Sequence, residues 1–309
     1  MFKKITKVLT VCLAKLFFNV CAKQVIGIKR QGALGDVLLI TPIIKELKKR
    51  NPKALIAVET GCFEALLHHP DVDCVVSKDV EKKASHIIDL NLAYESSPQL
   101  HLVDAYSQKA LGYNLEDKRP FLYSSLKDLK TLKKILQGQL DLEKDSYIVM
   151  HQAVSWENRT WPLNFWHQLV KDLLDKGFKI VIVGRKKDFS YQGDPRVINC
   201  LSNLTLAQIR ELMILAKLFI GPDSALMHIA MTTQVPIVAL FTVTDPQYRV
   251  TRQSKVISVT PTSSCRFCLH STNVCVTKLA CRFSTNHCLQ EITPEKVLEA
   301  ALESMVLPS

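Results

Sequence analysis

The stretch from residue 25 to residue 42 reads VIGIKRQGALGDVLLITP and contains the signals of a strand, a turn and a helix. Its first part, Val25 to Lys29, is a short run rich in β-branched residues, which predicts a buried strand. Gly32 and Gly35 then allow a tight backbone turn, and from Asp36 to Arg50 apolar residues recur at helical spacing. A strand, a turn and a helix in this order begin a βαβ unit, so the stretch predicts a parallel sheet covered by helices.

Outward from this stretch, short apolar runs keep alternating with segments of helical period. Pro42 predicts a kink in the first helix. In the rest of the first half we expect strands at residues 55–60, 74–76 and 86–90. A charged segment, 118–145, carries a helical pattern and precedes a fresh strand at 147–151. We therefore expect a domain boundary between residues 145 and 146.

The second half repeats the alternation. We expect helices at residues 163–176, at 205–217 and through His228, and strands at 179–184, 218–221 and 236–241. This order predicts an α/β protein with two Rossmann-like, doubly wound domains, residues 24–145 and 146–309, that face an interdomain cleft.

Composition narrows the class of protein. The chain has 309 residues, of which 47% are hydrophobic and 22% charged, as in soluble globular proteins of two domains. Forty Lys and Arg against 29 Asp and Glu leave a net charge of +11, which suits phosphates, nucleic acid or an anionic membrane surface. Ten cysteines in a chain of this length favour reduced thiols and a cytoplasmic location over a disulfide framework.

Residues 1–23 join a basic start to an apolar run that ends near Ala22. Lys15 interrupts the run, which is too short to span a bilayer. Helical spacing places Leu9, Leu13, Leu16, Phe17 and Val20 on one side, as in an amphipathic helix that lies on a membrane surface. A helix packed on its own domain and a cleaved signal peptide are the alternatives.

Asp36 is the candidate catalytic residue of the first half. It follows the first strand at the start of a helix, where open α/β sheets bind ligands, and its carboxylate can act as a general base. The alternative is a residue that only complements the helix dipole. The dinucleotide-binding pattern GxGxxG is absent, which disfavours a nicotinamide-dependent oxidoreductase.

Two loops of the second half offer groups for a diphosphate. Ser155 can donate a hydrogen bond to a phosphate oxygen and Arg159 can neutralise one. The stretch GPDSALMH, residues 221–228, follows a strand and opens a helix, so the amides of Ser224 to Leu226 can point at an anion. Thr244 and Asp245 close the next strand. The alternatives are ordinary capping residues and a core His228.

Five late cysteines, Cys265, Cys268, Cys275, Cys281 and Cys288, include one CxxC pair. Such thiols can hold zinc, and a nucleic-acid-binding protein with a zinc-stapled C-terminus would explain them together with the positive charge. No second CxxC completes the stronger pattern, so we expect no metal.

Together these motifs resemble the lipopolysaccharide heptosyltransferases of glycosyltransferase family 9, from about Val25 to Leu302. The resemblance is carried by GALGDVLLITP (32–42), by Ser155 through Arg159 to Pro162, by GPDSALMHIA (221–230), by Thr244-Asp245-Pro246 and by ITPEKV (292–297). These motifs come in the order found in the family.

The resemblance implies a GT-B architecture and an inverting transfer of heptose from ADP-heptose to the lipopolysaccharide inner core, without cofactor or metal. Asp36 matches the catalytic base, and Arg30 and Gly35 are the expected acceptor-binding residues. The positions that match donor binding are Ser155, Arg159, Asp223, Ser224, Ala225, Leu226, His228, Thr244 and Asp245. The implied partners are ADP-heptose and a lipid A-core acceptor, with peripheral association on the cytoplasmic face of the inner membrane and no nucleic acid.

The chain departs from the family pattern at four residues in three places. Members usually carry Gly at the position of Ala225, often Asn at that of Pro222, and often Gly-Pro where this chain has Thr242-Val243. A methyl group at Ala225 narrows the approach of the backbone to a diphosphate. These departures leave open another nucleotide sugar or acceptor, or a catalytically silent homologue that binds sugar nucleotides.

Overall fold

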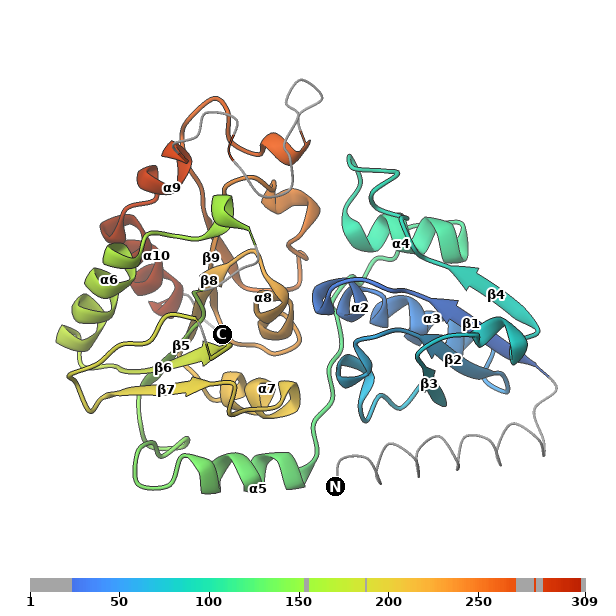
Figure 1. The fold of residues 1–309 in the computed structure, drawn as a ribbon, viewed down its shortest axis with the longest axis horizontal. Coiled ribbons are helices and arrows are strands. Elements are labelled where there is room, and N and C mark those ends of the chain that lie inside the picture. Colours follow the sequence, from blue (N-terminus) through green and yellow to red (C-terminus); the bar gives the residue numbers. More distant parts are fainter. Residues whose placement is uncertain (1–23, 153–155, 187, 271–280, 282–285, 307–309) are drawn as a thin grey trace. The chain divides into compact units, whose positions relative to one another are not determined.

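The computed structural model describes residues 24–152, 156–186, 188–270, 281 and 286–306. The segment expected to form an amphipathic helix, together with Ser155 and Cys275, lies outside these residues. The chain divides into two compact units, Met1–Glu116 and Asp117–Ser309 (Figure 1). Each unit is described by itself.

The first unit is built on a four-stranded parallel sheet in the order β3-β2-β1-β4. Its strands are β1 (Val25–Lys29), β2 (Leu55–Glu59), β3 (Cys74–Val76) and β4 (His86–Asp89). Its helices are α2 (Leu34–Leu39), α3 (Thr41–Arg50) and α4 (Leu102–Leu111), and two short 3-10 turns, η1 (Phe63–Leu66) and η2 (Val80–Lys82), follow β2 and β3. The expected kink is a break at Ile40, after which Pro42 occupies the first turn of α3, where its missing N–H costs nothing.

The second unit is built on a six-stranded parallel sheet in the order β7-β6-β5-β8-β9-β10. Its strands are β5 (Tyr147–Met150), β6 (Lys179–Gly184), β7 (Val197–Leu201), β8 (Leu218–Pro222), β9 (Ile237–Leu240) and β10 (Val256–Val259). Its helices are α5 (Leu126–Ile135), α6 (Leu163–Asp175), α7 (Leu206–Ile214), α8 (Ala225–Ala230), α9 (His287–Glu291) and α10 (Pro294–Val306), with short turns η3 (Glu157–Arg159), η4 (Pro246–Tyr248) and η5 (Cys268–His270).

The boundary between the units lies earlier than the expected boundary at 145/146. Helix α5 packs against α7, and its Leu132 and the following Leu136 are fully buried. The preceding Ser124 bonds the carboxylate of Glu211 and accepts a bond from Arg210 Nη1 at 2.9 Å, both at α7. The helix thus belongs to the second unit, although it precedes that unit's first strand in the chain.

Strand order explains where each unit can bind a ligand. In the second sheet the chain runs outward from β5 to β7, returns to β8 and runs outward again to β10, which is the Rossmann order. In the first sheet the order reverses between β1 and β4. Ligands bind outside the carboxyl ends of strands at such reversals, which here are the loops after β1 and β4 and those after β5 and β8. The expected class, α/β with two doubly wound domains, is confirmed.

A large apolar core supports the second of these loop pairs. Trp161 and Trp166 are fully buried and meet edge to face at 4.9 Å between ring centroids. The indole N–H of Trp161 donates to the Ile292 carbonyl at 2.7 Å, which ties the loop after β5 to the C-terminal helices. Within the described part of the chain, no helix has the length and apolar character needed to cross a bilayer.

Candidate active site

Asp36 lies in the first turn of α2, beyond the carboxyl end of β1. Its Oδ2 accepts the backbone N–H of Ala33 at 3.0 Å, and its own N–H donates to the Ala33 carbonyl at 3.0 Å. Gly32 has φ +123°, and a Cβ built there would lie 2.8 Å from Asp36 Oδ2. A side chain at position 32 would therefore be strained and would push on the carboxylate. Gly35 is buried in the same turn.

Arg30 contacts the same oxygen of the Asp36 carboxylate. Its Nη2 lies 3.2 Å from Asp36 Oδ2 and 3.5 Å from Glu95 Oε1. Burial opposes the charge of Arg30, whose side chain is 3% exposed, but Tyr106, Asp36 and Glu95 raise its pKa above the usual value. Arg30, which was expected on the acceptor side, thus points at the expected base.

The second loop pair centres on Asp223, a buried carboxylate directly after β8. Its Oδ2 accepts the Thr244 hydroxyl at 2.7 Å and lies 3.4 Å from Arg159 Nη1 and 3.7 Å from Arg249 Nε. Burial alone would raise the pKa of Asp223, but the two guanidinium groups outweigh it and lower the pKa. Three of the expected donor-binding residues therefore meet, and Asp223 stays ionised.

Ser224 is the N-cap of α8, the short helix that follows Asp223, and His228 lies in the last turn of that helix. Burial lowers the pKa of His228 to about 4, and Arg249 and Arg159 add to this while Asp223 opposes it, so the imidazole is neutral at physiological pH. Among the described residues, no group bonds His228 Nδ1 or Ser224 Oγ, although both atoms are buried. Buried polar atoms without a partner are costly and rare, so these two mark a place for a polar ligand.

Asn158 adds to this set. Its side chain is buried, and within the described part of the chain neither its Oδ1 nor its Nδ2 has a hydrogen-bond partner. The Thr242 hydroxyl donates to the Asn158 carbonyl at 2.7 Å, so the threonine that departs from the family pattern ties the Arg159 loop to the end of β9. The Arg159 guanidinium stacks 4.0 Å from the centre of the Trp156 ring.

The remaining expected donor-binding residues have smaller parts. Ala225 and Leu226 form the first turn of α8. The Asp245 carboxylate accepts the backbone N–H of Gln247 at 2.9 Å and its side-chain N–H at 2.8 Å, and thus serves its own turn. Sequence reasoning missed Arg249, which lies outside the quoted motifs, and Asn158, which lies within the Ser155–Pro162 motif but was given no role. The fold brings Arg249 to Asp223 and Asn158 to Thr242.

The segment around Cys268 contacts the loop after β9. The backbone N–H groups of Phe267 and Leu269 donate to the carbonyls of Thr242 and Val243, at 2.8 and 2.9 Å. Burial and the neighbouring thiols of Cys265, Cys281 and Cys268 raise the pKa of Cys288 to about 12. The described residues include no group of three or more His, Cys, Asp or Glu side chains arranged to hold a metal ion.

A family model described as glycosyltransferase family 9 (heptosyltransferase) matches residues 80–278. The chain belongs to this family of glycosyltransferases. It is 24% identical over 276 residues to lipopolysaccharide heptosyltransferase 3 of Escherichia coli. This match covers 68% of this chain and 81% of that protein. It is 31% identical over 102 residues to lipooligosaccharide heptosyltransferase 2 of Haemophilus ducreyi, and this match covers only 29% of each protein.

The family also agrees with the fold. The structure of the E. coli ADP-heptose lipopolysaccharide heptosyltransferase II superposes with a TM-score of 0.66 at 18% identity, over 92% of this chain and 98% of that one. The two doubly wound units are thus those of a GT-B glycosyltransferase.

Proposed function

We propose that this family 9 member transfers heptose from ADP-heptose to the inner core of lipopolysaccharide, with inversion at the anomeric carbon. The observation that carries the proposal is that each unit has a site at the reversal of its sheet order. The first site presents the carboxylate of Asp36 at a helix start. The second presents Arg159, and there the buried Ser224 Oγ and His228 Nδ1 have no hydrogen-bond partner among the described residues. The E. coli relative named for ADP-heptose supports the choice of donor.

The donor would be held by the loops of the second unit. Arg159 and the amides of Ser224 to Leu226 would face the diphosphate, with Ser155 from the same loop as Arg159. The neutral His228 can donate one hydrogen bond without adding charge. Asp223 and Thr244 would act through Arg159, because their contacts hold its guanidinium in place.

The transfer would proceed in one displacement. Asp36 takes the proton from an acceptor hydroxyl while that oxygen forms a bond to the anomeric carbon of heptose. The bond from this carbon to the phosphate oxygen breaks, and its electron pair leaves with ADP. Arg159 and the helix amides would stabilise the charge on the departing diphosphate. This scheme assigns no step to a metal or cofactor.

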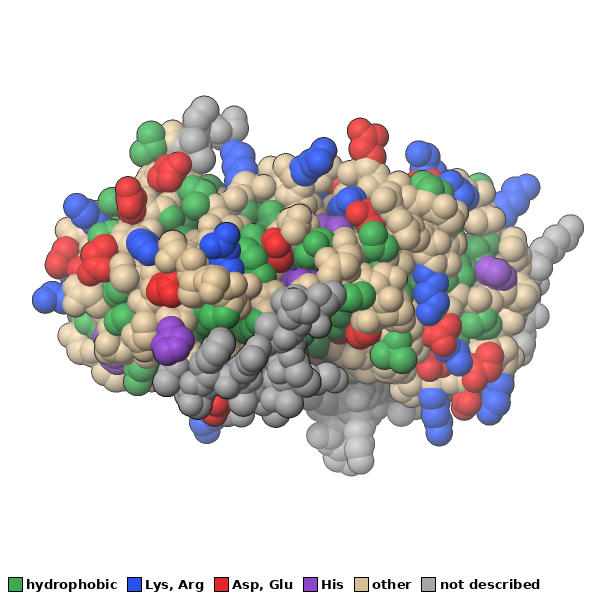
Figure 2. Space-filling model, turned by 90° about the horizontal axis from the view of Figure 1, so that it is seen from above, with side chains coloured by type: hydrophobic (Ala, Val, Ile, Leu, Met, Phe, Trp, Pro, Cys, Tyr) green, Lys and Arg blue, Asp and Glu red, His purple; other side chains and the backbone are tan. Residues whose placement is uncertain are grey.

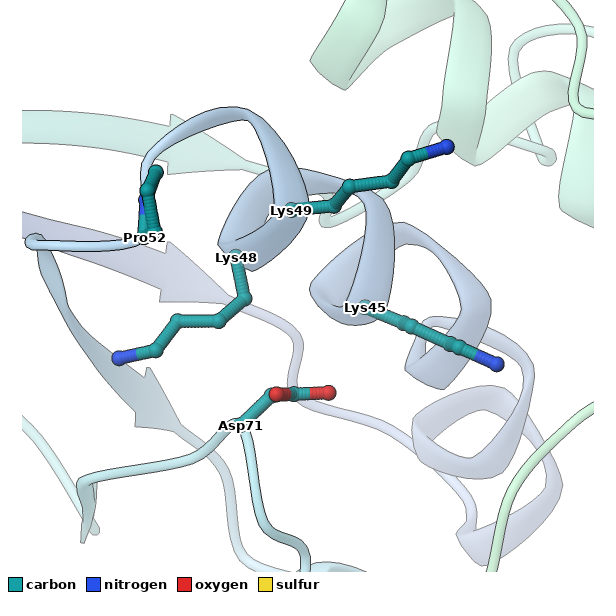
Figure 3. Close-up of a pocket in the computed structure, with 5 residues that line it drawn as sticks. All are labelled: Lys45, Lys48, Lys49, Pro52 and Asp71. Carbon is teal, nitrogen blue, oxygen red and sulfur yellow. The ribbon is translucent and has the colours of Figure 1, made fainter.

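We also propose that the first unit docks on an anionic membrane surface. A hollow of about 340 Å³ is lined by Lys45, Lys48, Lys49, Pro52 and Asp71. Figure 3 shows the three lysine side chains spreading from α3 around this hollow. The Leu55 N–H donates to the Gln24 carbonyl at 3.1 Å, so residue 24, which follows the basic segment 1–23 in the sequence, lies at the amino-terminal end of β1 and β2. Lysines close to an anionic leaflet contribute about 1 kcal/mol each.

A continuous basic track for nucleic acid finds no support on the face drawn in Figure 2. There, among the described residues, Lys and Arg side chains are interspersed with Asp and Glu. Cosedimentation with anionic vesicles tests the proposed membrane docking. Replacing Lys45 and Lys49 by Glu should abolish binding to anionic vesicles, whereas the same changes at the exposed Lys130 and Lys134 should not. Equal loss in both double variants would refute a specific docking surface.

The function itself is tested by ADP release from purified protein given ADP-heptose and truncated lipid A-core acceptors. Release that requires both substrates is the expected result. Release with another nucleotide sugar, but not with ADP-heptose, would replace the donor, in line with the methyl group at Ala225. Binding of sugar nucleotides without release for any acceptor would leave the catalytically silent homologue.

A further inference from the structure

Arg30 is buried among groups that the proposed reaction leaves unused. Its guanidinium lies 5.3 Å from the ring centre of Tyr94 and 5.2 Å from that of Tyr106, and these two rings meet edge to face at 6.1 Å. Its Nη1 donates to the Leu90 carbonyl at 3.4 Å. The arginine thus contacts both the loop after β4 and helix α4.

One nitrogen of Arg30 serves two carboxylates. Nη2 contacts Asp36 Oδ2 at 3.2 Å and Glu95 Oε1 at 3.5 Å. The Asp36 side chain is 17% exposed and that of Glu95 is 37% exposed, so the two acids differ in their access to water. A side chain that is 3% exposed and whose two terminal nitrogens already contact protein groups is poorly placed to bind an acceptor.

We infer that Arg30 is a positioning residue: its contact with Asp36 Oδ2 holds the carboxylate in place and keeps it ionised and able to accept a proton. Glu95 weakens this effect, because it contacts the same Nη2 of Arg30. The inference rests on the proposed function insofar as Asp36 is the base. A base must be ionised before it can take a proton, and an opposite charge within about 4–6 Å favours the ionised carboxylate. Glu95 acts in the opposite sense, because it draws on the same guanidinium and carries a like charge.

Other groups around Asp36 do not replace this arginine. Cys62, before η1, donates from its thiol to the Gly32 carbonyl at 3.6 Å, and its pKa is raised by burial and by Asp36 and Glu64. Burial and the charge of Asp36 raise the pKa of Tyr106 far above its usual value, so its phenol stays neutral. Arg30 is therefore the cation that the described contacts place against the Asp36 carboxylate.

The opposed roles of Arg30 and Glu95 give a signed test. In Arg30→Gln the acidic limb of the pH profile of kcat/KM should move to higher pH by about one to three units, the range seen when an Arg is removed from an Asp. In Glu95→Gln the limb should move to lower pH by a smaller amount. Arg30→Lys keeps the charge, so its limb should stay near that of the unaltered enzyme even where kcat falls because the planar fork is lost.

A titration without turnover separates this inference from the proposed function. The carboxyl ¹³C resonance of Asp36, identified by its absence in Asp36→Asn, should titrate at higher pH in Arg30→Gln and at lower pH in Glu95→Gln, whether or not heptose is transferred. Glu95 is partly exposed, so its variant tests the inference even where the arginine variant does not fold. Identical midpoints in all folded variants would overturn it. An unchanged limb with a raised acceptor KM alone would instead make Arg30 an acceptor-binding residue.

Discussion

Replacing Asp223 by Asn should destabilise the second unit strongly. The change keeps the shape of the side chain but leaves Arg159 and Arg249 beside a neutral group, 3.4 and 3.7 Å from the former carboxylate oxygen. Breaking a buried ion pair by removing one partner costs about 3–5 kcal/mol. Arg159 keeps some contact with water, at 17% exposure, which favours the lower end of about 3 kcal/mol.

The pH dependence of this loss has a fixed sign. The pKa of Asp223 is lowered in the folded protein from an ordinary 3.8. Its ionised form therefore stabilises the fold at any pH above 3.8, and this contribution disappears as the pH falls through the lower folded-state pKa. The difference in free energy of unfolding between the two proteins should accordingly be constant near neutral pH and shrink only in strong acid.

Tryptophan fluorescence during denaturant unfolding reports on the second unit, which contains Asp223. All three tryptophans of the chain lie in that unit: Trp156, Trp161 and Trp166. Asp194→Asn is the matched control. It removes the same charge from a carboxylate that pairs with Arg196 at 2.7 Å on the surface, and its effect should be far smaller. Equal effects of the two substitutions, or a difference that persists in strong acid, would refute the reasoning.

Three further changes address the two sites. Arg159→Gln should weaken ADP-heptose binding at least tenfold by calorimetry, because a charge-assisted bond to phosphate contributes about 1.5–3 kcal/mol; an unchanged Kd would remove Arg159 from the donor site. With the pKa of His228 near 4, ADP affinity should show no step from this residue between pH 6 and 8, and a step abolished by His228→Gln would contradict a neutral imidazole. Gly32→Ala should lower kcat, since its Cβ would lie 2.8 Å from Asp36 Oδ2, while Gly112→Ala, with an open Cβ position, should leave kcat unchanged.

Local patterns were sufficient to predict the elements around the site. Val25 to Lys29, Gly32 and Asp36 follow one another as strand, turn and helix, and the second sheet's loops at Arg159, Asp223 and Thr244 fall at the ends of expected strands. Each of these features depends on the periodicity of a few neighbouring residues, which a sequence displays directly.

Contacts between distant segments could not be predicted in this way. Helix α5 is charged and precedes the first strand of the second unit, so its sequence hides that Leu132 and Leu136 are buried there. Arg249 reaches Asp223 only because η4 turns back over the end of β8. Likewise, Tyr106 contacts Arg30 although the two residues are far apart in the sequence, and no repeat or spacing predicts this contact. Burial and charge at these positions are consequences of the sheet order.

The rate of ADP release by Asp36→Asn shows whether Asp36 removes the acceptor proton. Asp128→Asn provides the control, since Asp128 Oδ2 likewise accepts a backbone N–H at a helix start, from Ser125 at 2.8 Å, and its loss costs a comparable helix cap of about 1 kcal/mol. We predict that with ADP-heptose and a lipid A-core acceptor Asp128→Asn releases ADP at nearly the unaltered rate, whereas Asp36→Asn releases it at least a hundredfold more slowly. Equal rates of ADP release for the two variants would show that Asp36 is not the base.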